Sequence, residues 1–71
     1  MTAFVRYRSG AEIRQNFDNL FAAQVWIDAN HPTGDALIRH SHTSDGTLHE
    51  RNGFFYGRAL AIRERGRWVQ L

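Results

Sequence analysis

The sequence predicts an α+β domain in which an antiparallel sheet of five or six strands packs on a single α-helix, in the order ββαββββ or βαββββ. Three observations predict this fold. Turn dipeptides recur along the chain, the segments between them have strand character, and one segment alone carries a helical apolar stripe. At 71 residues, the chain is long enough for one domain, spanning 1–71. The turn dipeptides are Ser9-Gly10, Asp45-Gly46, Asn52-Gly53 and Arg65-Gly66.

The N-terminal segment predicts a strand from Ala3 to Arg8, because its residues alternate. Two structures fit the segment 11–17 that follows. We favour a second strand that pairs with the first through Ser9-Gly10. The alternative is a long helix starting at Gly10, in which Ser9 and Glu12 form a capping box.

A helix is predicted from about Asn19 to Asn30, with Asp18 or Asn16 as its N-terminal cap. His31-Pro32 ends it, because proline pushes the residue before it out of the helical region. The apolar stripe consists of Leu20, Phe21, Ala22, Val25, Trp26 and Ala29.

The rest of the chain predicts a meander of four strands, 36–43, 47–51, 54–63 and 67–71. Asp45-Gly46 and Asn52-Gly53 are expected to be hairpin turns. Pairing through Arg65-Gly66 sets Ile62 opposite Val69 and Arg63 opposite Trp68. We expect the helix to pack on the face formed by Leu60, Ile62, Val69 and Leu71.

Composition limits the class of protein. With 42% hydrophobic and 13% aromatic residues, the chain is that of a folded protein. It has no cysteine, no apolar run of signal-peptide length near Met1 and no run of 18 apolar residues. We therefore expect a complete small gene product that is cytoplasmic and has no membrane span.

Histidines are the candidate metal ligands. A turn at Asp45-Gly46 places His42 opposite His49, with His40 on the same face. Three imidazoles in this arrangement fit Zn²⁺ or Ni²⁺. No carboxylate completes the set, because Glu50 points to the other face. We expect no metal and no other cofactor, with the histidines solvated, facing a partner or making a pH-sensitive contact.

No enzyme motif is present. The chain lacks Gly-x-Ser-x-Gly, His-Glu-x-x-His, the P-loop and Gly-x-Gly-x-x-Gly, and it has no cysteine nucleophile. Its seven carboxylates are scattered, several of them at turns or caps, and show no acid–base pair. We therefore expect no catalytic residues and a protein that is not an enzyme.

Arginine provides the main functional signal. All nine basic residues are arginine, and the formal net charge is +2. Two explanations of this composition are open and compatible: a bias of the genome, and the planar donor fork of arginine, which suits carboxylates and phosphates. Arginines also cluster with aromatic residues near the last hairpin, a combination that suits nucleic acid or an acidic protein surface. The predicted partner-binding residues are Arg6, Arg8, Arg58, Arg63, Arg65 and Arg67.

The predicted order of elements resembles that of small phage-encoded type I anti-CRISPR proteins. Glu64-Arg65-Gly66-Arg67-Trp68-Val69 is similar to the turn and basic-Trp-Val strand that end one such type, and Gly10-Ala11-Glu12-Ile13 leading to Ala22-Ala23-Gln24-Val25-Trp26-Ile27 is similar to its middle. This chain departs by using arginine where lysine is frequent and by its histidine-bearing hairpin.

The resemblance implies a non-enzymatic inhibitor in the host cytoplasm. Such an inhibitor docks on a CRISPR surveillance complex, a protein complex that handles nucleic acid, and blocks target DNA. By resemblance, Arg63, Arg65 and Arg67 contact the partner. Two alternatives remain. One is a small DNA- or RNA-binding regulatory module, which the low net charge disfavours. The other is a homodimeric interaction factor that uses Phe54, Phe55 and Trp26; the chain is expected to be a monomer or a homodimer.

Overall fold

The computed structural model describes residues 1–41, 50–51, 54–55 and 59–71, which form one helix and seven strands. In chain order the elements are β1 (Thr2–Arg6), β2 (Glu12–Asn16), α1 (Leu20–Asn30), β3 (Asp35–Arg39), β4 (Glu50–Arg51), β5 (Phe54–Phe55), β6 (Ala59–Glu64) and β7 (Arg67–Gln70).

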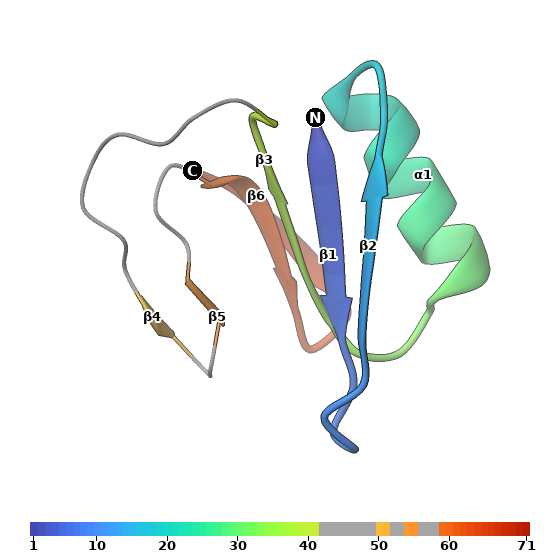
Figure 1. The fold of residues 1–71 in the computed structure, drawn as a ribbon, viewed down its shortest axis with the longest axis vertical. Helices are drawn as coiled ribbons and strands as arrows, with labels where there is room; N and C mark the ends of the chain where they lie inside the picture. Colours follow the sequence, from blue (N-terminus) through green and yellow to red (C-terminus); the bar gives the residue numbers. More distant parts are fainter. Residues whose placement is uncertain (42–49, 52–53, 56–58) are drawn as a thin grey trace.

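Five of the strands form an antiparallel sheet in the order β2-β1-β3-β6-β7, and α1 packs on one face of it (Figure 1). The strands β4 and β5 pair with each other and stand apart from this sheet. The predicted α+β fold, with one helix on a five-stranded antiparallel sheet, is confirmed.

The first two strands form the favoured hairpin, not a helix. β1 and β2 pair from Thr2 opposite Asn16 to Arg6 opposite Glu12. Gly10 has a φ of 94°, a conformation that glycine adopts without strain, and its N–H donates to the Tyr7 carbonyl at 2.9 Å. This turn stops a helix from starting at Gly10, so the capping-box alternative is wrong.

The helix is capped by a residue other than the two predicted. Asn19 is extended, and its side-chain oxygen accepts a hydrogen bond from the Ala22 N–H at 2.8 Å. Asn16 cannot cap, because it is the last residue of β2 and its Oδ1 accepts from the Thr2 hydroxyl at 2.9 Å. The predicted end is confirmed, since α1 stops at Asn30, just before His31-Pro32.

The meander differs from the prediction in one connection. The segment 54–63 was expected to be one strand, but β5 and β6 are separate strands in different sheets. β6 pairs directly with β3, so the residues between them are an insertion in the main sheet. β4 and β5 pair with Arg51 opposite Phe54. The predicted turns at Asp45-Gly46 and Asn52-Gly53 and the His42–His49 pair lie outside the described residues.

The face that meets α1 is the opposite of the one predicted. Ile62 does pair with Val69 and Arg63 with Trp68. However, Ile62 packs with Leu37 and Phe4, whereas Trp68 packs against the cluster that contains the helix. Alternation then places Ala61 and Arg63 of β6 on the helix side. The core between sheet and helix is built from Ala3, Val5, Ala23, Ile27, Ala36 and Ile38.

Candidate functional site: the arginine end of the sheet

Three connections meet at one end of the five-stranded sheet. Arg6 at the end of β1 pairs with Asp35 at the start of β3, and Ala36 pairs with Arg63 near the end of β6. The β1–β2 turn, the α1–β3 loop and the β6–β7 turn therefore lie at the same end, the lower one in Figure 1. We call this region the arginine end, defined by Arg6, Arg8, Arg65 and Arg67.

Carboxylates already compensate part of the positive charge. Arg6 lies between two acidic neighbours in the sheet, Glu12 on β2 and Asp35 on β3. Its Nη2 atom is 3.4 Å from an oxygen of Glu12. Arg67 pairs across the strands with Glu64. The positive charge of Arg6 is therefore partly compensated by carboxylates of the same protein.

Arg8 and Arg65 differ from Arg6, because they are exposed at the tips of two turns. Neither has an ion-pair partner within the described part of the chain. Arg65 has a φ of 54° and Gly66 a φ of 77°, so both central residues of this turn have positive φ, as in a type I′ turn. The turn projects the Arg65 side chain into solvent.

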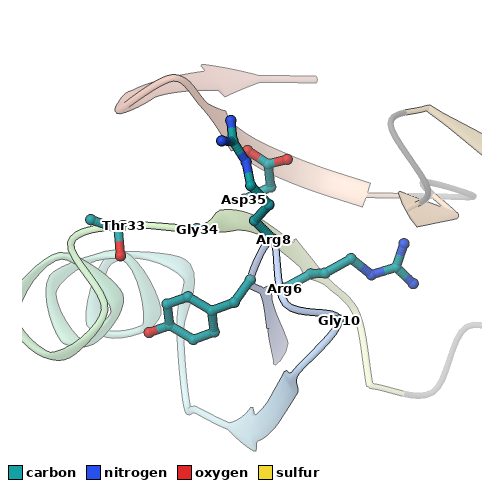
Figure 2. Close-up of a pocket in the computed structure, with 7 residues that line it drawn as sticks. Arg6, Arg8, Gly10, Thr33, Gly34 and Asp35 are labelled. Carbon is teal, nitrogen blue, oxygen red and sulfur yellow. The ribbon is translucent and has the colours of Figure 1, made fainter.

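An open pocket of about 580 Å³ lies between the β1–β2 turn and the α1–β3 loop (Figure 2). Its charged groups are two guanidinium groups and one carboxylate, a combination that offers donors for an anion and one acceptor. The Tyr7 hydroxyl at its wall is hydrogen-bonded to Nδ1 of His31, which fixes the ring. The pocket is lined by Arg6, Tyr7, Arg8, Gly10, Thr33, Gly34 and Asp35.

Gly34 allows the loop to approach β1 closely enough to form this pocket. It has a φ of 98°, and a Cβ there would lie 3.0 Å from the Arg6 carbonyl oxygen and 3.3 Å from the Tyr7 ring. A larger residue would therefore push the loop away from the strand. Gly34 was not among the predicted site residues, although Thr33-Gly34 directly after a proline is a turn signal.

Arg63 does not belong to the surface, and the prediction that it does was wrong. Its side chain is 2% exposed, and its guanidinium group lies against α1 and the loop after it. Nη1 donates to Asp28 at 2.8 Å, and Nη2 donates to the carbonyl of Gly34 at 3.0 Å and to that of His31. These bonds satisfy the carbonyl of His31 at the carboxyl end of the helix, where a cation is also favoured by the helix dipole, and that of Gly34 in the loop after it.

Trp68 completes this internal cluster. Its indole N–H lies 3.1 Å from both carboxylate oxygens of Asp28, and the Arg63 guanidinium lies 5.8 Å from its ring centre. The expected contact between Arg63 and Trp68 is confirmed. The basic-Trp-Val strand thus uses its tryptophan to hold β7 against α1.

The structure brings together Arg6, Arg8, Arg65 and Arg67 from the predicted set, and it removes Arg63 from it. Arg58 lies outside the described residues. No cluster of three metal-ligating side chains occurs in the described ranges, which include His40 but not His42 or His49. Nor does any helix in those ranges have the length and apolarity needed to cross a membrane.

Comparison with known proteins adds no relative: no family model, curated protein or solved structure matches this chain. The fold and the site define a small α+β protein with exposed arginines at one end of its sheet.

Proposed function

We propose that the chain is a non-enzymatic binding protein that docks its arginine end on an anionic surface of a partner. One observation carries the proposal: Arg8 and Arg65 project from two turns at the same end, exposed and without an ion-pair partner in the described ranges. A guanidinium group in this state is ready to make charge-assisted hydrogen bonds to carboxylates or phosphates. Arg6 and Arg67 flank them and add positive charge.

We further propose that the partner is a CRISPR surveillance complex and that docking blocks its target DNA, as in type I anti-CRISPR proteins. The supporting features are the order hairpin, helix and antiparallel strands, together with the basic-Trp-Val strand, which is β7. The site of action would be the cytoplasm of the host cell. The surface that would occupy the DNA path is the arginine end. Arg63, which the resemblance assigned to the partner contact, is not part of that surface.

The test compares two double variants that lower the net charge by the same two units. Arg8→Gln with Arg65→Asn removes the exposed charges of the arginine end. Gln15→Glu with Phe21→Glu adds two acids at exposed positions toward the other end of the sheet and helix. Binding of each to purified type I surveillance complex is measured, together with the retention of target DNA by that complex.

We expect the arginine variant to lose about tenfold or more in affinity for each arginine, since a hydrogen bond to a charged group contributes about 1.5–3 kcal/mol. The variant with added acids should still bind and still displace target DNA. Equal losses in both variants would show that only net charge matters, and they would contradict the proposal.

A homodimeric interaction factor is the second candidate, favoured by the outer face of α1. Phe21 is 75% exposed and Val25 is 51% exposed, one helical turn apart. Asp28, the only charged residue of α1, is engaged by Arg63. Trp26 is unsuited to the interface expected from the sequence, because it packs against the core. Sedimentation of the wild type and of Phe21→Glu as single species of monomer mass would exclude this candidate.

A further inference from the structure

One edge of the five-stranded sheet is formed by β7, which pairs with β6 on one side and with no strand of the described ranges on the other. The N–H of Leu71 donates to the Leu60 carbonyl at 2.9 Å, so these two residues are a hydrogen-bonded pair. In an antiparallel ladder such pairs alternate with pairs whose N–H and C=O groups point away from each other, outward. Within β7 the outward residues are therefore Trp68 and Gln70.

These outward backbone groups are unused. No hydrogen bond joins the backbone N–H or C=O of Trp68 or Gln70 to another group in the part of the chain that the structure describes. The side chains do not protect this edge, since the last three residues of β7 are uncharged and Val69 is 48% exposed. The opposite edge strand, β2, carries Glu12 and Arg14, and charged side chains commonly keep an edge from pairing.

We propose that β7 pairs with β7 of a second copy of this chain, so that two sheets join into one around a two-fold axis at Val69. In this antiparallel register Trp68 of each copy lies opposite Gln70 of the other, and the two residues exchange both of their N–H···O bonds. The β6–β7 turn stays outside the joined strands, so Arg65 remains in solvent. The proposal rests on the second candidate function, the homodimer, and gives it an interface other than the outer face of α1.

The side chains of this register suit a second copy. Val69 meets the same residue of the other copy, and Leu71, which is 64% exposed, lies opposite Arg67. The aliphatic stem of an arginine covers an apolar neighbour while its charged end stays in water. Moving the axis to Arg67 would set two like charges directly opposite each other, which is destabilising. The edge is therefore self-complementary in the one register that pairs both outward residues of each strand and keeps the arginines apart.

Dimerisation is measured by sedimentation equilibrium from about 10 µM to 1 mM protein, because two short strands form a small interface and self-association depends on concentration. The wild type should shift from monomer to dimer across this range. Gln70→Pro removes the outward N–H, which β6 does not use, and should raise the dimer dissociation constant about tenfold or more. Circular dichroism verifies that the variant is folded.

The matched control is Gln70→Ala, which separates the backbone from the side chain. Like the proline variant, it removes the side chain that accepts a hydrogen bond from Gln24, but it keeps the N–H. It should therefore dimerise like the wild type.

Cysteine cross-linking tests the register, since the chain has no cysteine of its own. Opposite residues of a non-hydrogen-bonded pair lie close enough for a disulfide. Val69→Cys should therefore form disulfide-linked dimers in a glutathione buffer, and it should do so more readily than Val25→Cys. The second variant is the control, because Val25 has a similar exposure, 51%, on the outer face of α1.

Three results would overturn the proposal: a wild type that stays a monomer over the whole range, a Gln70→Pro variant that dimerises as well as Gln70→Ala, or a Val25→Cys variant that cross-links as readily as Val69→Cys. The last result would leave the homodimer in place with α1 as its interface. Docking of the arginine end on an anionic partner is measured separately with the surveillance complex, and none of these results decides it.

Discussion

Arg63 shows how one side chain can hold several elements together. It lies on β6, and its guanidinium group reaches Asp28 of α1 and carbonyls of the α1–β3 loop. Solvent screens the ion pair because the Asp28 side chain is 53% exposed, so the bonds to carbonyls contribute the larger share. Without the guanidinium group, these carbonyls would lose their donor within the protein.

We therefore predict that Arg63→Met lowers the free energy of unfolding by about 3 kcal/mol, since it strips the partners from several polar groups at once. Methionine retains an apolar stem of similar length, so packing is changed least. Urea unfolding followed by tryptophan fluorescence measures the effect. The control is Arg67→Met on exposed β7, which should change stability by less than about 0.5 kcal/mol. If both variants unfold at the same urea concentration, the internal role of Arg63 is refuted.

Arg65 is the opposite case, a residue whose side chain is free while its backbone is strained. A φ of 54° is unfavourable for arginine and well tolerated by asparagine. Arg65→Asn should therefore raise the free energy of unfolding by about 0.5–1 kcal/mol. The same change should weaken binding to the anionic partner.

The comparison for Arg65 is Arg67→Asn, which replaces a neighbouring arginine on β7, where φ is not positive. This variant should not gain stability, because asparagine is disfavoured in strands. A stabilised protein that binds less well would separate the contribution of Arg65 to function from its effect on folding. Unchanged stability of Arg65→Asn would contradict the strained turn.

At the scale of elements, α1 is fixed by its ends and by the sheet, and less by an amphipathic pattern. Apolar residues occur around much of its circumference, including exposed Phe21 and Val25. Its inner side contributes Ala23 and Ile27, both fully buried. The start of the helix therefore depends strongly on the cap at Asn19.

We predict that Asn19→Ala lowers the free energy of unfolding by about 1 kcal/mol, because the Ala22 N–H loses its acceptor. Thermal unfolding followed by circular dichroism at 222 nm measures the loss. Asp18→Ala tests the neighbouring residue that the sequence offered as a cap and should have a smaller effect. A larger loss for Asp18→Ala than for Asn19→Ala would reassign the start of the helix.

At the scale of the whole molecule, the arrangement of charge matters more than its total. A net charge of +2 is small, yet four arginines lie at one end of the sheet and two more flank Phe4 on the face away from α1. Our proposals assign no metal to either group of arginines. The only candidate metal ligands that the sequence indicated are His40, His42 and His49.

We predict that the untagged protein contains no stoichiometric zinc and that EDTA leaves its melting temperature unchanged. A structural metal would stabilise the folded state, so a chelator would lower the melting temperature by several degrees. Elemental analysis and calorimetry with and without EDTA provide the measurements. A lower melting temperature in the presence of EDTA would indicate that the histidines bind a metal.

Local patterns in the sequence were enough to predict the class of fold, the first and last hairpins and the end of the helix. Each of these depends on residues close together in the chain, such as Ser9-Gly10, Arg65-Gly66 and His31-Pro32. Turn dipeptides and proline act through their own backbone conformations, so neighbouring residues suffice. The same reasoning placed Arg6 and Arg8 on the first hairpin and Arg65 and Arg67 on the last, but it did not place the two hairpins at the same end of the sheet.

The tertiary structure alone decided which face of the sheet meets the helix and which strand pairs with β3. Alternation shows that Ile62 and Arg63 point to opposite sides of β6, but it does not say which side is covered, and one step along the strand exchanges the two faces. Arg63 faces the helix because α1 and its loop present a carboxylate and carbonyls there. Pairing of β3 with β6 joins residues far apart in sequence, which no turn between them encodes.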